Sequence, residues 1–210
     1  MAKQTILSDK TIGERVLKRV FPSGLTVYVV RKPHFSKSYA TVGIRYGSVD
    51  TRARANGRMK RLPDGVAHFL EHKIFEMPEG DAFDLFAAKG ASANAFTSFS
   101  STRYLFGTTA AYAANLRTLL DMVFELHVTD ENVEKEKGII GQEIAMYDDD
   151  PDWRLYFGSL GALYAKNPVR IDIAGTKETI APITPGMLRA IHRCYYHPKN
   201  MVLSAVSPEP

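Results

Sequence analysis

Two pairs of β-rich segments constrain the fold of this chain more than any other feature of its sequence. LTVYVV (25–30) and YATVGIRYG (39–47) are rich in β-branched and aromatic residues and are separated by a polar turn, which predicts two strands. ASANAFTSFS (91–100) and RYLFGTTA (103–110) meet at a Ser-Ser pair and predict a hairpin. Since strands joined by short turns run antiparallel, the sequence predicts an antiparallel sheet.

Apolar residues recur with helical spacing between and after these strands. The predicted helices cover residues 63–77, 82–89, 111–126, 129–147, 153–165 and 182–196. Asp81 and Thr129 are expected to cap two of them, and MVLSAV (201–206) predicts a last strand. Hairpins mixed with helices indicate an α+β fold, a mainly antiparallel sheet with helices packed on one face, rather than a doubly wound parallel fold.

Basic residues slightly outnumber acidic ones in the 210-residue chain, giving a formal net charge of +4. The excess is scattered, and the densest basic stretch, Arg52 to Arg61, is interpreted as a solvated loop. No nucleic-acid-binding motif accompanies it, so we expect no nucleic-acid partner. The 45% hydrophobic content is ordinary for one globular domain.

The cysteine content and the N-terminal residues bear on the cellular compartment. Cys194 has no second cysteine with which to form an intrachain disulfide, so nothing indicates an oxidising compartment. Charged residues interrupt MAKQTILSDKTIGERV before an apolar signal core can form, and no run of about 18 apolar residues occurs. We therefore expect a cytoplasmic protein without a membrane span.

The pentapeptide His-Phe-Leu-Glu-His at residues 68–72 carries the strongest chemical signal, because it lies inside a predicted helix. His68 and His72 are four residues apart, so their imidazoles sit one helical turn apart and can converge on one metal ion. Glu71 shares that face, where a carboxylate can reach a metal-polarised water. The alternative is a pair of surface or core histidines that happen to have this spacing.

Catalytic zinc usually takes three protein ligands and leaves one position for water, so a third ligand is needed. The acidic helix EKEKGIIGQEI offers Glu136 and Glu143, which are seven residues apart and project from one face. One of them could ligate zinc while the other orients a ligating histidine. The residues alone favour a plainer interpretation, a solvated charged face shared with Glu134, Lys135 and Lys137.

Three sequence blocks occur in an order that resembles a known family. HFLEHKIFE, GASANAFTSFSSTRYLF and EKEKGIIGQEIAMYDDDPDW together are similar to the N-terminal catalytic domain of the insulinase/pitrilysin family of inverted-motif zinc metallopeptidases, especially its bacterial processing-peptidase-like members. The resemblance spans residues 20–206. It implies an N-terminal extension at 1–19, a zinc-binding catalytic domain at 20–206, and a tail or linker at 207–210 leading to an absent second domain.

The resemblance assigns a role to each residue of the site. It implies that His68, His72 and Glu143 bind Zn²⁺ and that Glu71 is the general base, which takes a proton from a zinc-polarised water attacking a peptide carbonyl. Glu136 matches the family's further acidic residue, which supports the site without binding the ion. The expected activity is that of a zinc metalloendopeptidase acting on peptides or small unfolded proteins.

Asn94, Ala95 and Phe96 match the family's edge strand beside the zinc. The resemblance implies that an extended peptide substrate adds there as an extra strand, so that recognition depends on main chain more than on side chains. Asn94 is expected to hydrogen-bond the substrate backbone and Phe96 to line a side-chain pocket. The residues alone favour a plain hairpin strand.

The family builds its chamber from two such domains or two subunits, so the resemblance implies a second homologous domain or subunit as a partner. The isolated chain is expected to bind zinc and to have weak or absent peptidase activity. The alternative is a non-catalytic scaffold or assembly subunit of the same fold, which typically lacks the metal motif retained here. A structural zinc site is less well supported, since such sites use four ligands, often cysteines, and the chain has one cysteine.

Overall fold

The computed structural model describes residues 3–55 and 57–208. Within them, seven strands form one sheet in the order β1-β2-β3-β11-β4-β10-β9. Their bounds are β1 (Lys3–Asp9), β2 (Glu14–Val20), β3 (Thr26–Arg31), β11 (Met201–Ser207), β4 (Ser38–Ile44), β10 (Thr102–Thr108) and β9 (Ala91–Thr97). Neighbouring strands run antiparallel except β3 and β11, which are parallel. The predicted α+β fold with a mainly antiparallel sheet is confirmed.

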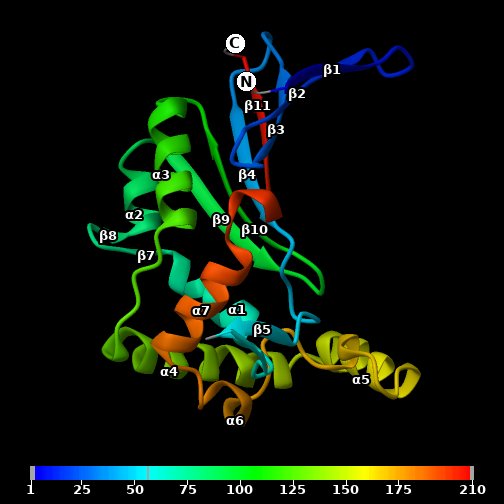
Figure 1. Ribbon diagram of the computed structural model, residues 1–210, viewed down its shortest axis with the longest axis vertical. Helices are drawn as coiled ribbons and strands as arrows, with labels where there is room; N and C mark the ends of the chain where they lie inside the picture. The colour runs from blue at the N-terminus through cyan, green and yellow to red at the C-terminus, as the bar shows by residue number, and fades with distance from the viewer. Residues whose placement is uncertain (1–2, 56, 209–210) are drawn as a thin grey trace.

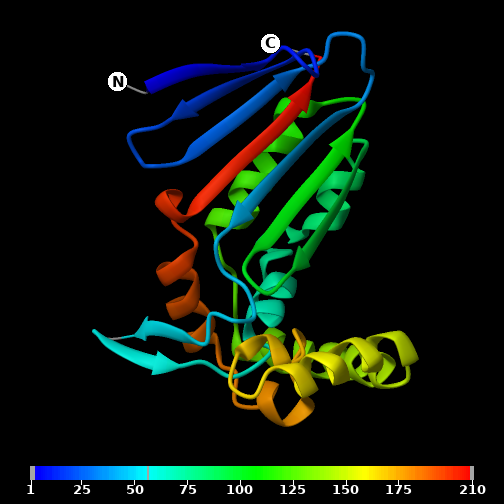
Figure 2. The ribbon, with the colours of Figure 1, turned by 90° about the vertical axis from the view of Figure 1, so that its right-hand side faces the viewer.

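The helices gather on one face of the sheet and beyond one end of it (Figures 1 and 2). Their bounds are α1 (Val66–Ile74), α2 (Ala82–Ala87), α3 (Tyr112–Phe124), α4 (Asp130–Asp148), α5 (Pro151–Leu163), α6 (Lys177–Ile180) and α7 (Pro185–Tyr195), with 3-10 turns at Pro168–Arg170 and Pro198–Asn200. Figure 2 shows α2 and α3 behind the sheet and α4, α5 and α6 below its end. None of the helices in the described residues is both long and apolar enough to cross a membrane.

Two small hairpins lie outside the sheet, β5 (Arg52–Ala55) with β6 (Arg58–Arg61) and β7 (Glu76–Met77) with β8 (Gly80–Asp81). The basic stretch is therefore built on a hairpin rather than being the solvated loop that its charge suggests, and Ala53 of β5 is buried, with 1% exposure. Its cross-strand pairing begins at Arg52 with Arg61, and β6 is exposed along its whole length.

Alternate side chains of the central strands form the core. On β4, Val42 is 1% exposed while Tyr39 is 40% exposed, as expected of a strand with one covered face. Phe106 of β10 stacks on Phe86 of α2 with ring centroids 5.6 Å apart, and Leu119 of α3 belongs to the same buried cluster. The core therefore lies between the sheet and its helices. Helix α1 contacts the strands β9 and β10 of the sheet, and it also contacts helix α4.

The sheet differs from the sequence prediction at its N-terminal side. Strands β1 and β2 cover most of the segment 1–19, which is expected only as an N-terminal extension and for which no strand is predicted. Strands β3 and β4, expected to follow one another across a turn, are not paired. Instead β11 lies between them, parallel to β3 and antiparallel to β4, so the end of the chain completes the centre of the sheet.

The predicted helices are found with shifted ends. The capping box at Thr129 is confirmed, since its side chain accepts from the Asn132 amide while the Asn132 side chain accepts from the Thr129 amide. Helix α5 begins at Pro151, before the predicted start, because Asp150 caps it. At the C-terminus, β11 extends to Ser207, and residues 209 and 210 of the expected tail 207–210 lie outside the described residues.

Candidate metal centre

Helix α1 carries the pentapeptide, as the sequence predicts, and is buried along nearly its whole length. Phe69 and Leu70 are fully buried in the core and fix the rotation of the helix about its axis. His68 and Glu71 are 8% and 7% exposed, and with His72 they line a cleft of about 630 Å³. The apolar residues of the pentapeptide therefore anchor the helix, and its polar residues reach one open cleft.

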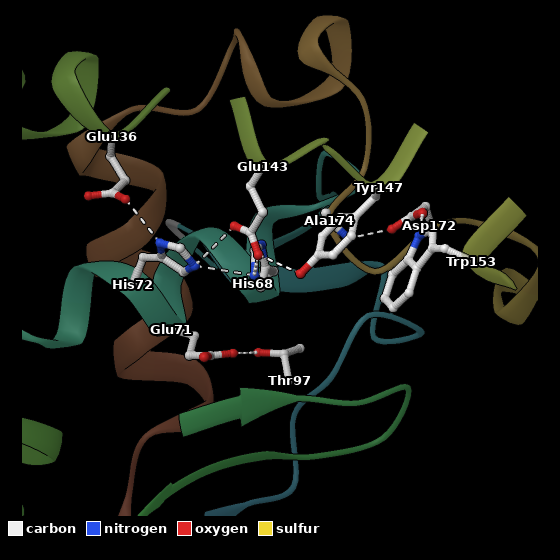
Figure 3. A network of polar contacts seen from close by, with 10 residues as sticks. All are labelled: His68, Glu71, His72, Thr97, Glu136, Glu143, Tyr147, Trp153, Asp172 and Ala174. Atoms are coloured by element: carbon white, nitrogen blue, oxygen red, sulfur yellow. Dashed lines mark hydrogen bonds and ion pairs between the residues drawn. The ribbon is translucent and has the colours of Figure 1, made fainter. Parts of the chain in front are cut away.

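Helix α4 crosses α1 and brings the third group to the histidines (Figure 3). The carboxylate of Glu143 places Oε1 3.7 Å from Nε2 of His68 and Oε2 3.5 Å from Nε2 of His72. The two Nε2 atoms are 3.2 Å apart. The structure thus brings together His68, His72 and Glu143, with one candidate ligand atom of each within 4.8 Å of the others.

This donor set fits a zinc ion. Two imidazoles and one carboxylate are the ligand types of catalytic zinc sites, and three protein ligands leave a fourth position open. With bonds of 2.0–2.1 Å, a tetrahedral ion separates two ligand atoms by about 3.4 Å, close to the 3.2–3.7 Å found here. Burial and the neighbouring His72 lower the pKa of His68 to about 4, so that its imidazole is neutral and free to bind a metal at neutral pH.

Glu136 lies two helical turns before Glu143 on α4 and contacts the other side of the His72 ring. Its Oε1 lies 3.0 Å from Nδ1 of His72, which therefore donates to the carboxylate and leaves Nε2 free to face Glu143. Burial opposes charge on both groups, but this hydrogen bond and the attraction of the two charges raise the pKa of His72 and lower that of Glu136. The structure thus separates the two acidic residues of α4, one on each side of the His72 ring.

Lys73 supports this arrangement, a role that its sequence pattern does not predict. Its side chain is fully buried, pairs with Glu76, and places Nζ 3.5 Å from Oε2 of Glu136 and 3.1 Å from the carbonyl oxygen of Asn132. A lysine beside an apolar helix face is the only local signal of such a role, because a buried ammonium requires acidic partners. It ties α1 to the first half of α4.

Glu71 points toward the sheet rather than toward α4. The hydroxyl of Thr97, at the end of β9, donates a 2.5 Å hydrogen bond to Oε2 of Glu71 (Figure 3). Burial raises the pKa of Glu71, and the hydrogen bond from Thr97 opposes that rise. The carboxylate is thus held in the cleft between the histidines and the edge strand.

Strand β9 forms the wall of the cleft opposite α4. Asn94, Ala95 and Phe96 all line it, together with the residues of α1. Asn94 accepts a hydrogen bond from the Ala95 amide at 2.8 Å, and the Phe96 ring is 43% exposed with the Arg103 guanidinium 5.5 Å from its centroid. In the described part of the chain β9 pairs with β10 alone, which leaves its outer edge open along the cleft.

Known proteins match this chain over most of its length. A family model described as insulinase, peptidase family M16, matches residues 26–177. The chain belongs to this family. A relative from Bacillus subtilis strain 168, called the uncharacterized zinc protease YmfH, is 54% identical over 199 residues, which cover 94% of this chain and 46% of the relative.

Solved structures of M16 proteins share the fold. The crystal structure of an M16-like peptidase from Alicyclobacillus acidocaldarius is 46% identical with a TM-score of 0.91, and the match covers 97% of this chain and 48% of that one. An M16 inactive domain from Pseudomonas fluorescens, at 18% identity, has a TM-score of 0.80 and matches in fold alone. The chain thus spans about half the length of these three M16 proteins.

Proposed function

We propose that this chain is the zinc-binding catalytic half of a metalloendopeptidase that hydrolyses extended peptides or small unfolded proteins. In this proposal His68, His72 and Glu143 hold Zn²⁺, Glu136 orients His72, and Glu71 is the general base. The observation that carries it is the convergence of the three donor atoms within 4.8 Å of one another, with the Glu71 carboxylate in the same cleft.

In the proposed reaction the zinc ion acts as a Lewis acid and the Glu71 carboxylate transfers the proton. Bound Zn²⁺ supplies Lewis acidity, which polarises a peptide carbonyl and makes water more acidic. Glu71 accepts the proton that the water loses as its oxygen bonds to the carbonyl carbon, and gives that proton to the amine as the C–N bond breaks. The raised pKa caused by burial makes Glu71 a stronger base, and Thr97 fixes its orientation.

The open edge of β9 supports substrate binding as an added strand. Unpaired main-chain groups at a sheet edge accept an extended peptide, and they do so with little regard to its side chains. The side chain of Asn94 offers an amide to the substrate backbone, and exposed Phe96 offers apolar contact to a substrate side chain. A peptide on this edge runs past Thr97 and Glu71, which brings its carbonyls to the proposed metal site.

A second homologous domain or subunit completes the enzyme in this proposal. The match to about half of the Bacillus subtilis relative and of the Alicyclobacillus acidocaldarius structure supports it. Phe96 on the cleft wall is 43% exposed, so substrate bound along β9 stays in contact with water. A covering partner supplies further transition-state contacts, and losing one such contact typically costs 10²–10³-fold in rate.

The alternative is a non-catalytic scaffold of the same fold. The structure described as an M16 inactive domain shares this fold. The presence of both histidines, Glu71 and Glu143 in one cleft favours the enzyme, because an assembly surface does not require them.

The deciding experiment measures zinc content and peptide cleavage of this chain, alone and together with the proposed second domain or subunit. We expect about one zinc ion per chain in both samples, and cleavage that rises at least a hundredfold when the second half is present. Absence of zinc from both samples contradicts the proposed site, and zinc without cleavage in the complete protein favours the scaffold.

The Glu71→Gln substitution tests whether Glu71 acts as a base rather than as a zinc ligand. The variant is expected to keep its zinc and lose turnover in the complete protein, because the amide cannot accept the proton. His72→Ala is the matched comparison and is expected to lose both. If the Glu71→Gln variant loses zinc, Glu71 is a zinc ligand, and its proposed role as the base is contradicted.

A further inference from the structure

A line of contacts runs outward from Glu143 on the side opposite Glu136 (Figure 3). The Tyr147 hydroxyl donates to Oε1 of Glu143 at 2.5 Å. The Tyr147 ring stacks on Trp153 with centroids 4.3 Å apart and planes inclined by 12°. The indole Nε1 of Trp153 then donates to Oδ2 of Asp172 at 2.5 Å. A metal-facing carboxylate is therefore linked through two aromatic side chains to a second carboxylate.

Each member of this line is fixed by its own element. Tyr147 lies four residues after Glu143 and so one turn further along α4. Trp153 lies in the first turn of α5, where its amide donates to the Asp150 cap. Asp172 is held by its second oxygen, which accepts from the Ala174 amide at 2.9 Å.

The far end of the line reaches the helix that carries the histidines. Ala174 packs so closely on Gly65, the residue before α1, that a Cβ on Gly65 would lie 2.3 Å from the Ala174 carbonyl oxygen. The contacts therefore join α4, α5, the loop around Asp172 and the start of α1 into one frame around the cleft. Tyr147, Trp153 and Ala174 line the same cleft as His68 and Glu143.

We propose that Tyr147 is a positioning residue for Glu143, and that Trp153 and Asp172 hold Tyr147 in place. The inference rests on the proposed zinc site. The hydroxyl engages Oε1, which lies nearer His68, and leaves Oε2, which lies 3.5 Å from Nε2 of His72, as the oxygen offered to the ion. Ligation through one oxygen keeps the fourth position of the ion open, as a catalytic site requires.

The geometry distinguishes this role from plain packing. Stacking on Trp153 alone needs only the Tyr147 ring, whereas the hydroxyl is aimed at a carboxylate in the cleft. A phenol is protonated at neutral pH and therefore acts as a donor to the carboxylate. Such partners of metal ligands typically alter metal affinity 10–100-fold when removed.

The test uses the protein expressed from its complete natural coding sequence, and measures the zinc dissociation constant by competition with a chelator. We expect Tyr147→Phe, which keeps the ring and removes the hydroxyl, to weaken zinc binding about tenfold or more. Zinc-edge X-ray absorption is expected to show one additional oxygen ligand as Glu143 becomes bidentate. Tyr156→Phe, which removes the same atom from a ring 51% exposed on α5, is the matched control and is expected to match the wild type.

A second variant tests the outer part of the line. Trp153→Phe keeps an aromatic ring and removes the donor to Asp172, so we expect several-fold weaker zinc binding in the otherwise natural protein. In the Tyr147→Phe background the same change is expected to have no further effect, because Trp153 acts through Tyr147. If Trp153→Phe weakens zinc binding equally with and without Tyr147→Phe, Trp153 does not act through Tyr147.

The outcomes separate this inference from the proposed function. If the natural protein binds zinc and His72→Ala abolishes binding, but Tyr147→Phe leaves both the affinity and the oxygen count unchanged, Tyr147 has no positioning role and the zinc site stands. If the natural protein binds no zinc, the proposed site and this inference are both overturned.

Discussion

Thr97, the last residue of the edge strand β9, donates a 2.5 Å hydrogen bond to Glu71 on α1. The same strand offers its open edge to an extended peptide in the proposed function, so one strand both binds the substrate and orients the base. The Thr97 hydroxyl also lies 3.4 Å from that of Thr102, which donates to the Tyr46 carbonyl oxygen at 2.9 Å. The position of the Glu71 carboxylate therefore depends on the register between β9 and β10.

Thr97→Val removes this hydroxyl at nearly constant volume. A hydrogen bond to a charged group contributes about 1.5–3 kcal/mol, so we expect kcat/KM of the complete protein to fall about 10–100-fold. Zinc content is expected to stay constant, because the Thr97 hydroxyl makes its hydrogen bonds to Glu71 and Thr102, neither of which is a proposed ligand. Thr97→Ser restores the donor and is expected to restore most of the activity; equal losses in the serine and valine variants contradict the role of the hydroxyl.

The buried Lys73 predicts a stability effect. Lys73→Met keeps the length of the side chain but leaves Glu136, itself 6% exposed, without its ammonium partner. Breaking a buried ion pair from one side typically costs about 3–5 kcal/mol, and we expect a loss of this order in the free energy of unfolding measured in urea.

Two variants control the Lys73 experiment. Lys135→Met makes the same change at an exposed position of α4 and is expected to alter the free energy of unfolding by less than about 0.5 kcal/mol. Lys73→Met combined with Glu136→Gln is expected to lose less than the sum of the two single variants, since the amide leaves no unpaired charge. Strict additivity contradicts a direct interaction between the two residues.

The local part of the candidate site is readable from the sequence, and the tertiary part is not. The spacing of His68 and His72 predicts their shared face because a helix repeats every 3.6 residues. Whether Glu136 and Glu143 form a solvated face or meet those histidines depends on how α4 crosses α1, which no local pattern encodes. The resemblance to a known family, rather than periodicity, decided between the two interpretations.

The same distinction explains the errors in the sheet. The turn between β3 and β4 predicts neighbouring strands, but β11 lies between them, and that pairing depends on a strand about 160 residues later in the chain. The partners Thr97, Lys73 and Tyr147 were missed for a similar reason. Each is an ordinary residue in its own helix or strand, and its role becomes visible only through contact with another element.

His192 predicts how stability depends on pH. Its imidazole is 9% exposed, and Nε2 donates to the Val123 carbonyl oxygen at 3.0 Å. Burial lowers the pKa of His192 below its ordinary value of 6.5, and the hydrogen bond to Val123 only partly opposes this. The unfolded chain therefore binds this proton more readily than the folded one, so the contribution to stability is full above pH 6.5 and is lost as the pH falls toward the folded-state value.

The measurement is the free energy of unfolding of the wild type and His192→Gln at a series of pH values between 8 and 5. Glutamine can donate to Val123 without titrating, so its stability is expected to fall less steeply below pH 6.5. The same substitution at His34, an exposed turn residue, controls for loss of an imidazole. Parallel curves for the wild type and His192→Gln contradict the assignment.

The backbone conformation of Gly65 affects where the helix that carries the two histidines lies. It precedes α1 with φ of +88°, and a Cβ there would meet the Ala174 carbonyl oxygen at 2.3 Å. Gly13 also has positive φ, +67°, but a Cβ there meets nothing within 4 Å, so Gly13→Ala carries only the cost of the left-handed backbone, about 1–2 kcal/mol.

Gly65→Ala adds to that backbone cost a forced separation of α1 from the loop around Asp172. We expect it to lower the free energy of unfolding by more than Gly13→Ala does, and to weaken zinc binding as well, because His68 lies in the first turn of the helix that must move. Denaturation in urea measures the first effect, and chelator competition measures the second. If the two alanine variants are equally stable and bind zinc equally well, the contact between Gly65 and Ala174 does not position α1.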